Sequence, residues 1–245
     1  MSIVRVNKQG PHSSLRSSSI VLLWLAPLTA WSYEPIEVRG AGSIQGAVAY
    51  RKPVPEPARV EVTKDKAFCG EKGLKDERLL VSGSKGLKNV VVFISKIDRG
   101  KALVPTAATL DNNGCRYEPH VQAVSVGATF RVKNSDPVLH NTHARLKKAD
   151  VFNFALPNQG VEAEKPITRT GMIEVSCDAG HTWMKAYVAA FDHPYFAVTD
   201  SDGRFTLPDV PPGAYTLAYW HEKLGQKTKK LEVRAGEAAD GSLDY

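Results

Sequence analysis

Three side chains that bind soft metals lie within eight consecutive residues of this sequence. They are Cys177, His181 and Met184, and a second imidazole, His140, lies upstream in the segment 134–141. A thiolate, an imidazole and a thioether are ligands that copper prefers, and no common structural role requires all three together. Two histidines and one cysteine in a plane, with a weak methionine above it, describe a mononuclear blue-copper centre. The spacing therefore predicts one copper ion bound by these four residues.

The positions of the four residues fit that chemistry. Cys177 and His181 come from one tight loop, which fixes their mutual geometry, and Met184 follows three residues later, where it can lie over the metal as a long axial ligand. His140 must come from a different strand, so the site would join two parts of the fold. A rigid site changes little between Cu(I) and Cu(II), which favours fast electron transfer.

Two other interpretations of these residues are weaker. Nucleophilic catalysis by Cys177 and His181 would require a third orienting group and an oxyanion donor, and neither is evident in the sequence. Zinc accepts cysteine and histidine but gains nothing from Met184, so it is the minor alternative metal. A buried free cysteine or a lone hydrogen-bonded histidine is common, and only the grouped spacing favours a metal site.

Four further histidines need an interpretation. His143 lies three residues after His140, so on a strand it points to the opposite face and is expected at the surface or in a supporting role. His120 follows a proline at the start of an expected strand. Whether His120 or His143 contributes to the site stays open. His193 and His221 lie near aromatic residues and are expected in a core or an interface.

The first 32 residues have the pattern of a secretory signal peptide. Basic residues precede an apolar run over residues 20–30, and residues 30–32 give the small-x-small pattern of a cleavage site. The run is too short to span a bilayer comfortably, and no other segment is long and apolar enough. We therefore expect an exported, periplasmic protein with no membrane span after cleavage.

Net charge and cysteine content indicate which partners and which compartment suit this protein. Residues 1–32 hold three basic residues and no acidic residue, so cleavage would lower the net charge from +6 to +3. No basic stripe interleaved with aromatics appears, so nucleic-acid binding is not predicted. Cys69 and Cys115 lie in turn-like settings and are expected to pair in an oxidising compartment, which leaves Cys177 free for a metal.

Alternating and β-branched residues dominate after residue 32, and helical periodicity is hard to find, which predicts an all-β fold of the sandwich type. The segment 58–62 alternates as a strand does, whereas 147–164 is the least strand-like part and is expected to hold a loop with a short helical turn. The other expected strands share alternation or a continuous apolar run bounded by turn residues: 43–50, 89–94, 117–124, 129–133, 168–177, 186–191, 199–207, 214–220 and 231–233.

The segment Asn134-x-Asp136-x-x-x-His140-Asn141, followed by Cys177, His181 and Met184, resembles the cupredoxin family of plastocyanin, amicyanin and azurin. The likeness covers about residues 105–192 and implies a Greek-key sandwich. It implies His140, Cys177 and His181 as the three strong ligands and Met184 as the axial one. It also implies that Asn141 steadies the ligand loop.

Two features of the ligand loop depart from that family. Three residues separate Cys177 from His181, whereas plastocyanin and amicyanin have two. The spacing matches the last part of the dinuclear copper loop of cytochrome oxidase subunit two, but that loop has another cysteine where this chain has Ile173. A mononuclear site is therefore favoured, and its colour and potential stay open.

The order of segments resembles exported proteins of the methylamine-utilisation-like type. Residues 199–207 and 211–217 are similar to carboxypeptidase-regulatory-like sequences, which implies a small transthyretin-like sandwich. We expect a signal peptide at 1–32, an N-terminal β segment at 33–104 that pairs with the C-terminal part, a cupredoxin domain at 105–192 and a second β segment at 193–245.

The sequence thus favours an exported copper protein that transfers single electrons and is not an enzyme. By analogy with the family, a redox protein would dock transiently on an apolar surface around His181 and Trp183. The alternative is a structural β-sandwich module, or a protein for non-redox copper binding and delivery.

Overall fold

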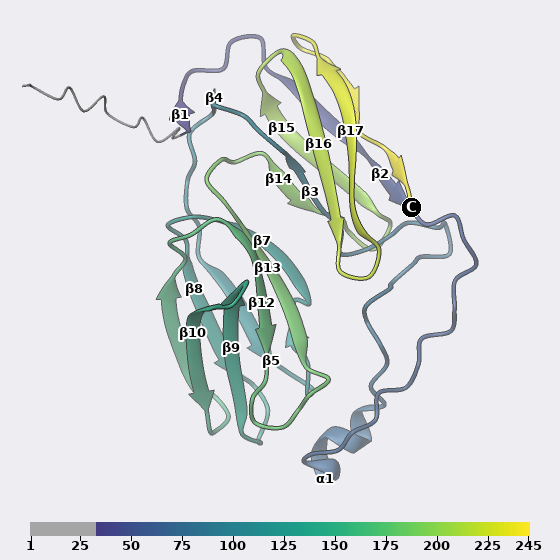
Figure 1. The fold of residues 1–245 in the computed structure, drawn as a ribbon, viewed down its shortest axis with the longest axis vertical. Coiled ribbons are helices and arrows are strands. Elements are labelled where there is room, and N and C mark those ends of the chain that lie inside the picture. Colours follow the sequence, from purple (N-terminus) through teal and green to yellow (C-terminus); the bar gives the residue numbers. More distant parts are fainter. Residues whose placement is uncertain (1–32) are drawn as a thin grey trace, which may run out of the picture. The chain divides into compact units, whose positions relative to one another are not determined.

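The computed structural model describes residues 33–245, so the expected signal peptide lies outside the described residues. The all-β prediction is confirmed, because nearly all regular structure in this part of the chain is strand (Figure 1). The described residues contain no helix that could cross a bilayer. Two β-sandwiches, each with its own apolar core, account for most of the strands.

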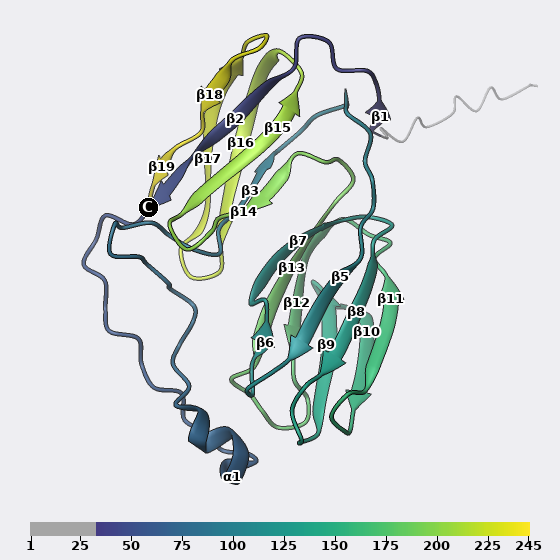
Figure 2. The same ribbon diagram turned by 180° about the vertical axis from the view of Figure 1, so that it is seen from behind.

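The central sandwich contains a five-stranded sheet in the order β10-β9-β12-β13-β7 and a four-stranded sheet in the order β11-β8-β5-β6 (Figure 2). Its strands are β5 (Ala108–Asn112), β6 (Tyr117–Glu118), β7 (Val121–Ser125), β8 (Thr129–Asn134), β9 (His140–Leu146), β10 (Ala149–Leu156), β11 (Glu162–Pro166), β12 (Gly171–Ser176) and β13 (Lys185–Phe191). Leu110 and Phe130 from one sheet and Ile173 and Val188 from the other share one buried cluster. That shared burial holds the two sheets together.

The second sandwich is built from residues that precede and follow the central one. One sheet has the order β14-β3-β16-β17 and the other β15-β2-β18, with β19 also paired to β2. The strands are β2 (Gly42–Ala49), β3 (Val91–Ile94), β14 (Phe196–Val198), β15 (Arg204–Val210), β16 (Gly213–His221), β17 (Gly225–Val233), β18 (Ala238–Asp240) and β19 (Leu243–Asp244). Outside both sandwiches, β1 (Glu34–Pro35) pairs with β4 (Arg99–Gly100).

A long connection joins β2 to β3, and we call its residues 51–88 the arm. The arm holds α1 (Lys66–Cys69) and the short 3-10 helix η1 (Gly70–Lys72), and otherwise has only isolated bridges (Figures 1 and 2). The disulfide predicted between Cys69 and Cys115 is present and ties α1 to the turn before β6. The arm is therefore fixed to the central sandwich by a covalent bond.

The expected strand at 58–62 is wrong. Arg59 forms one isolated bridge with Lys75, and no strand develops. The alternation has another cause, since Val60 and Val62 pack on the buried disulfide while their neighbours face solvent. An alternating pattern reports which side chains are covered, and it does not require a neighbouring strand.

The expected loop at 147–164 is also wrong, because this segment contains all of β10 and the start of β11. Lys147 adopts a left-handed φ of 57° in the tight turn between β9 and β10. A register shift between Asp150 and Phe152 then interrupts the strict two-residue alternation. The irregularity and the flanking charges hide a strand whose Phe152 and Leu156 are buried in the core.

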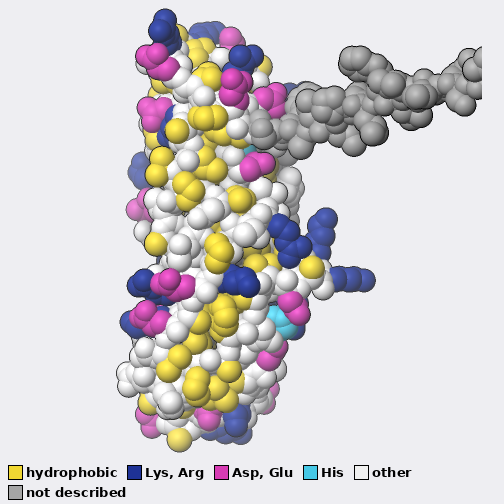
Figure 3. Space-filling model, turned by 90° about the vertical axis from the view of Figure 1, so that its left-hand side faces the viewer, with side chains coloured by type: hydrophobic (Ala, Val, Ile, Leu, Met, Phe, Trp, Pro, Cys, Tyr) yellow, Lys and Arg dark blue, Asp and Glu magenta, His cyan; other side chains and the backbone are white. Residues whose placement is uncertain are grey.

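The surface charges are mixed. On the face in Figure 3, apolar side chains gather along the middle, and Lys and Arg side chains lie among Asp and Glu side chains toward the edges.

Substitution of Gly203 tests how closely backbone segments approach each other in the second sandwich. Its φ is +74°, and a Cβ there would lie 2.3 Å from the carbonyl oxygen of Val48 and 2.7 Å from the amide nitrogen of Leu87. Gly236 has a similar φ of +70° but open space around the same position. Gly236→Ala should therefore cost only the left-handed conformation, about 1–2 kcal/mol.

Gly203→Ala should cost clearly more, about 3 kcal/mol or above, because backbone atoms must also move. Urea unfolding of both variants measures the two losses in free energy of unfolding. Equal losses would contradict the close approach at Gly203.

Candidate metal centre

Two strands of one sheet bring the predicted ligands together. Cys177 directly follows β12, and His140 begins β9, which pairs antiparallel with β12. His181 lies in the loop between β12 and β13, where its carbonyl oxygen accepts a hydrogen bond of 2.9 Å from the amide of Met184. Strand pairing fixes His140 against Cys177, and the tight loop fixes His181 against both.

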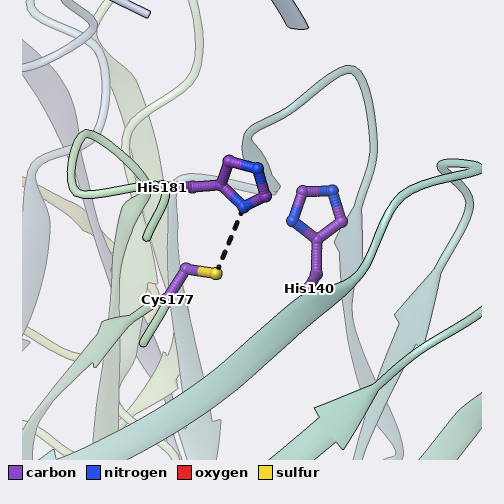
Figure 4. Close-up of side chains that lie close together, drawn as sticks. All are labelled: His140, Cys177 and His181. Carbon is purple, nitrogen blue, oxygen red and sulfur yellow. Dashed lines mark hydrogen bonds between the residues drawn. The ribbon is translucent and has the colours of Figure 1, made fainter. Parts of the chain in front are cut away.

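The donor atoms of His140, Cys177 and His181 lie within 4.8 Å of one another (Figure 4). The Cys177 Sγ lies 3.6 Å from His181 Nδ1, and the two ring centroids are 4.7 Å apart. Both imidazoles have no exposed surface, and Cys177 is 6% exposed. A thiol and two imidazoles in a dry pocket are a donor set that suits copper.

Each imidazole is held through its distal nitrogen. His140 Nε2 lies 2.8 Å from Asp136 Oδ2, and His181 Nε2 lies 2.8 Å from Asp65 Oδ2. A carboxylate accepts, so each Nε2 carries the donated proton, and in the neutral ring each Nδ1 keeps its lone pair. This arrangement, in which a carboxylate orients a histidine, is the usual one around metal-binding histidines.

His140 Nδ1 is the atom that tests whether the residues fit a metal. It is buried and has no hydrogen-bond partner among the described residues. An unsatisfied buried nitrogen is costly, and native structures contain few of them. Its lone pair belongs to the donor set that also contains the Cys177 sulfur, so a bound metal would satisfy it. The residues present therefore fit a copper ion.

The environment favours a thiolate at Cys177. Burial alone would raise the pKa of the thiol, but the neighbouring His140 and His181 imidazoles and the amide N–H groups of Asn141 and Ala179 lower it to about 6. The Asn141 amide lies 3.3 Å from the sulfur. The thiolate is the form that binds metals.

Asp136 is well prepared to hold His140. Its two carboxylate oxygens accept hydrogen bonds from the amides of Gly114 and Cys115 at 2.7 and 2.8 Å. Burial opposes ionisation, yet His140 and these two amides keep the pKa of Asp136 below its usual value. Burial likewise lowers the pKa of His140, but Asp136 and the Cys177 sulfur raise it overall.

Met184 and Asn141 occupy positions near the cluster. Met184 is 1% exposed and shares the apolar core with Cys177, and its role as axial ligand stays a prediction. The side-chain oxygen of Asn141 accepts a hydrogen bond of 3.2 Å from the Asp178 amide. Asn141 thus contacts the start of the ligand loop, as expected for a residue that steadies it.

The other histidines lie outside the cluster of donor atoms. His120 Nε2 forms a hydrogen bond with the Glu222 carboxylate, and His143 Nε2 lies 2.8 Å from Asp150 Oδ1. His193 and His221 are buried, and burial lowers the pKa of both. A second set of close donor atoms contains Cys115, Asp136 and His140, but the Cys115 sulfur is already bonded to Cys69.

The structure adds one residue to the site. His181 has no exposed surface and Trp183 is partly exposed, and a docking face around them stays a prediction. Asp65, which no sequence signal marks, lies on the arm 116 residues before His181, and its carboxylate lies 2.8 Å from His181 Nε2. No local spacing links residues so far apart, so only tertiary structure could reveal this contact.

Comparison with known proteins gives partial likenesses. The family model "Polysaccharide lyase family 4, domain II" matches residues 171–240. No curated protein matches the sequence. Among solved structures, a Cu(I) form of an amicyanin variant is 21% identical, with a TM-score of 0.31, over 35% of this chain and 82% of that one.

Two other copper proteins show similar likenesses. A purple cupredoxin from Nitrosopumilus maritimus is 23% identical, with a TM-score of 0.29, over 34% of this chain and 99% of that one. A copper-containing nitrite reductase from Thermus scotoductus is 21% identical, with a TM-score of 0.31, over 40% of this chain and 25% of that one. The assignment of the metal centre rests on the donor geometry and not on these likenesses.

The lowered pKa of Cys177 gives a prediction for the metal-free protein. Thiolate absorbance in the ultraviolet should appear with a midpoint near pH 6, far below the ordinary value of 9.0. His181→Phe should raise the midpoint, because it removes one of the groups that stabilise the thiolate.

The lowered pKa of Cys177 also makes the free energy of unfolding depend on pH. Because the folded pKa is the lower one, the stabilisation is fully present above the unfolded pKa and is lost as pH falls through about 6. Cys177→Ala corrects the absorbance for tyrosine and should remove this part of the pH dependence in urea unfolding. A midpoint near 9 in the native protein would contradict the assignment.

Proposed function

We propose that this protein is an exported electron carrier that binds one copper ion through His140, Cys177 and His181, with Met184 as axial ligand. The observation that carries the proposal is the convergence of three buried donor atoms within 4.8 Å, one of them an unsatisfied imidazole nitrogen. A copper ion held there would supply a one-electron couple between Cu(I) and Cu(II). The electron would pass to or from a transient protein partner.

The chain's own residues prepare the site for that role. Cys177 supplies a thiolate near neutral pH, and Asp136 and Asp65 fix the two imidazole rings. Full burial of both rings excludes water from the donor atoms. Because the ligands come from paired strands and a tight loop, the donor positions change little when an electron arrives or leaves.

Export is supported by the disulfide and the leader pattern. A bond between Cys69 and Cys115 suits an oxidising compartment such as the periplasm. Residues 1–32 have the sequence pattern of a cleaved signal peptide. N-terminal sequencing of the protein from a periplasmic fraction would test this part, and retention of the first 32 residues would oppose it.

Copper storage or delivery without redox turnover is the second candidate. The absence of exposed surface on His181 favours it, because no imidazole edge is offered to a redox partner. The absorption spectrum of the Cu(II)-loaded protein separates the two functions. Intense visible thiolate charge transfer supports the carrier, and a colourless copper protein supports storage or delivery.

Two substitutions test the ligand set. Cys177→Ser should abolish the visible band, because serine gives no thiolate bond to copper, while the fold stays near intact since the disulfide lies elsewhere. His140→Ala should also remove tight copper binding.

His143→Ala is the matched control, because His143 lies on the same strand outside the donor cluster. Metal analysis and visible spectra of the three proteins give the result. Unchanged colour in Cys177→Ser, or equal copper loss in His140→Ala and His143→Ala, would refute the assignment.

The axial role of Met184 gives a separate prediction. Met184→Leu should retain copper and raise the reduction potential, because a lost thioether donor destabilises Cu(II) more than Cu(I). Met172→Leu is the control, since Met172 is partly buried in a different apolar cluster. Protein-film voltammetry measures both, and an unchanged potential in Met184→Leu would remove Met184 from the ligand set.

A further inference from the structure

The arm reaches the metal centre at one residue. Asp65 Oδ2 lies 2.8 Å from Nε2 of His181, and the Asp65 side chain is 29% exposed, whereas the imidazole is fully buried. The Lys64 side chain, one residue earlier, lies 3.5 Å from where a Cβ on Gly180 would be. The arm therefore covers the ligand loop at the residue before His181 as well as at its ring.

The side chain of Asp65 does not cap α1, although its backbone carbonyl oxygen accepts hydrogen bonds from the amides of Phe68 and Cys69. Asp65 occupies the N-cap position of this helix, where an aspartate usually accepts a hydrogen bond from a helix amide, but its side chain makes no such bond. Its backbone is left-handed, with φ 50° and ψ 45°, a region that aspartate and asparagine enter more readily than other residues with a Cβ. An unused side-chain cap, with the carboxylate turned to His181 instead, indicates a role at the metal centre.

Two contacts hold the arm at this place. Cys69, four residues after Asp65, is bonded to Cys115. Trp183 Nε1 donates a hydrogen bond of 3.0 Å to the carbonyl oxygen of Cys115, and the Trp183 ring stands edge-on to His181 at 5.2 Å. The ligand loop and the arm therefore share one packed group around the disulfide.

We propose that Asp65 is a positioning residue of the metal centre. Its carboxylate accepts the Nε2 proton of His181 and so fixes both the ring orientation and the tautomer that turns Nδ1 toward the Cys177 sulfur. Asp136 does the same for His140 from a loop four residues away, so two unrelated segments supply one arrangement. The effect of Asp65 on copper binding rests on the proposed copper function. Its effect on the orientation and tautomer of His181 does not, because it can be measured in the metal-free protein.

Three variants of the full chain test the proposal. Asp65→Gly removes the carboxylate, and glycine adopts a φ of +50° without strain. Asp65→Asn keeps an oxygen that accepts the Nε2 proton and tolerates the same backbone. Glu71→Gln is the control, since it removes one negative charge from an exposed residue of the same arm.

Competition with a chromophoric Cu(I) chelator gives the affinity of each protein. Asp65→Gly should bind Cu(I) about 10–100-fold more weakly and shift the visible band of the Cu(II) form, as loss of an orienting carboxylate does at other metal sites. Asp65→Asn should recover most of the affinity, and Glu71→Gln should match the native protein. Wild-type affinity in Asp65→Gly, or equal losses in Asp65→Gly and Asp65→Asn, would overturn the proposal.

Nitrogen-15 NMR of the metal-free native protein gives a readout that needs neither copper nor a variant. The neutral His181 ring should carry its proton on Nε2, the nitrogen that faces Asp65. A proton on Nδ1 would overturn the positioning role, even if Asp65→Gly failed to fold. A native protein that binds no copper but carries the Nε2 proton would refute the copper function alone.

Discussion

The hydrogen bond from each imidazole to a carboxylate is the constraint on which the metal centre depends. A histidine ring offers two nitrogens, and only one can face the Cys177 sulfur. Asp136 and Asp65 occupy the other nitrogen of His140 and His181, so each Nδ1 is left facing the pocket and has a lone pair there when the ring is neutral. Without these acceptors, both rings could turn or change tautomer, and the donor atoms would no longer converge.

Burial of the two imidazole rings strengthens these hydrogen bonds, and it also makes any unpaired polar atom beside them costly in free energy. His140 and His181 have no exposed surface, and an unpaired polar atom in such surroundings loses its hydration without compensation. The backbone amides of Gly114 and Cys115 satisfy the Asp136 carboxylate, so charge and hydrogen bonding balance on that side. One polar atom of the group, His140 Nδ1, stays unsatisfied among the described residues, where a metal would bind.

The arm covers the metal centre at His181. It leaves the second sandwich after β2, is bonded to the central sandwich through Cys69 and Cys115, and places Asp65 against His181. A long connection normally has little fixed structure, and here a covalent bond and packing around Trp183 hold it. The disulfide thus contributes to the ligand geometry as well as to the fold.

The sequence by itself determined the elements whose signals are local. The spacing of Cys177, His181 and Met184 selected the ligand loop, alternation predicted most strands, and the turn-like settings of Cys69 and Cys115 predicted their bond, which the structure contains. Local signals also misled, because alternation at 58–62 reflects cover by the disulfide and a bulge hides β10. Only the tertiary structure decided that Asp65 holds His181 and that no imidazole edge is exposed. These contacts join residues 116 positions apart, and such pairing depends on how the whole chain packs.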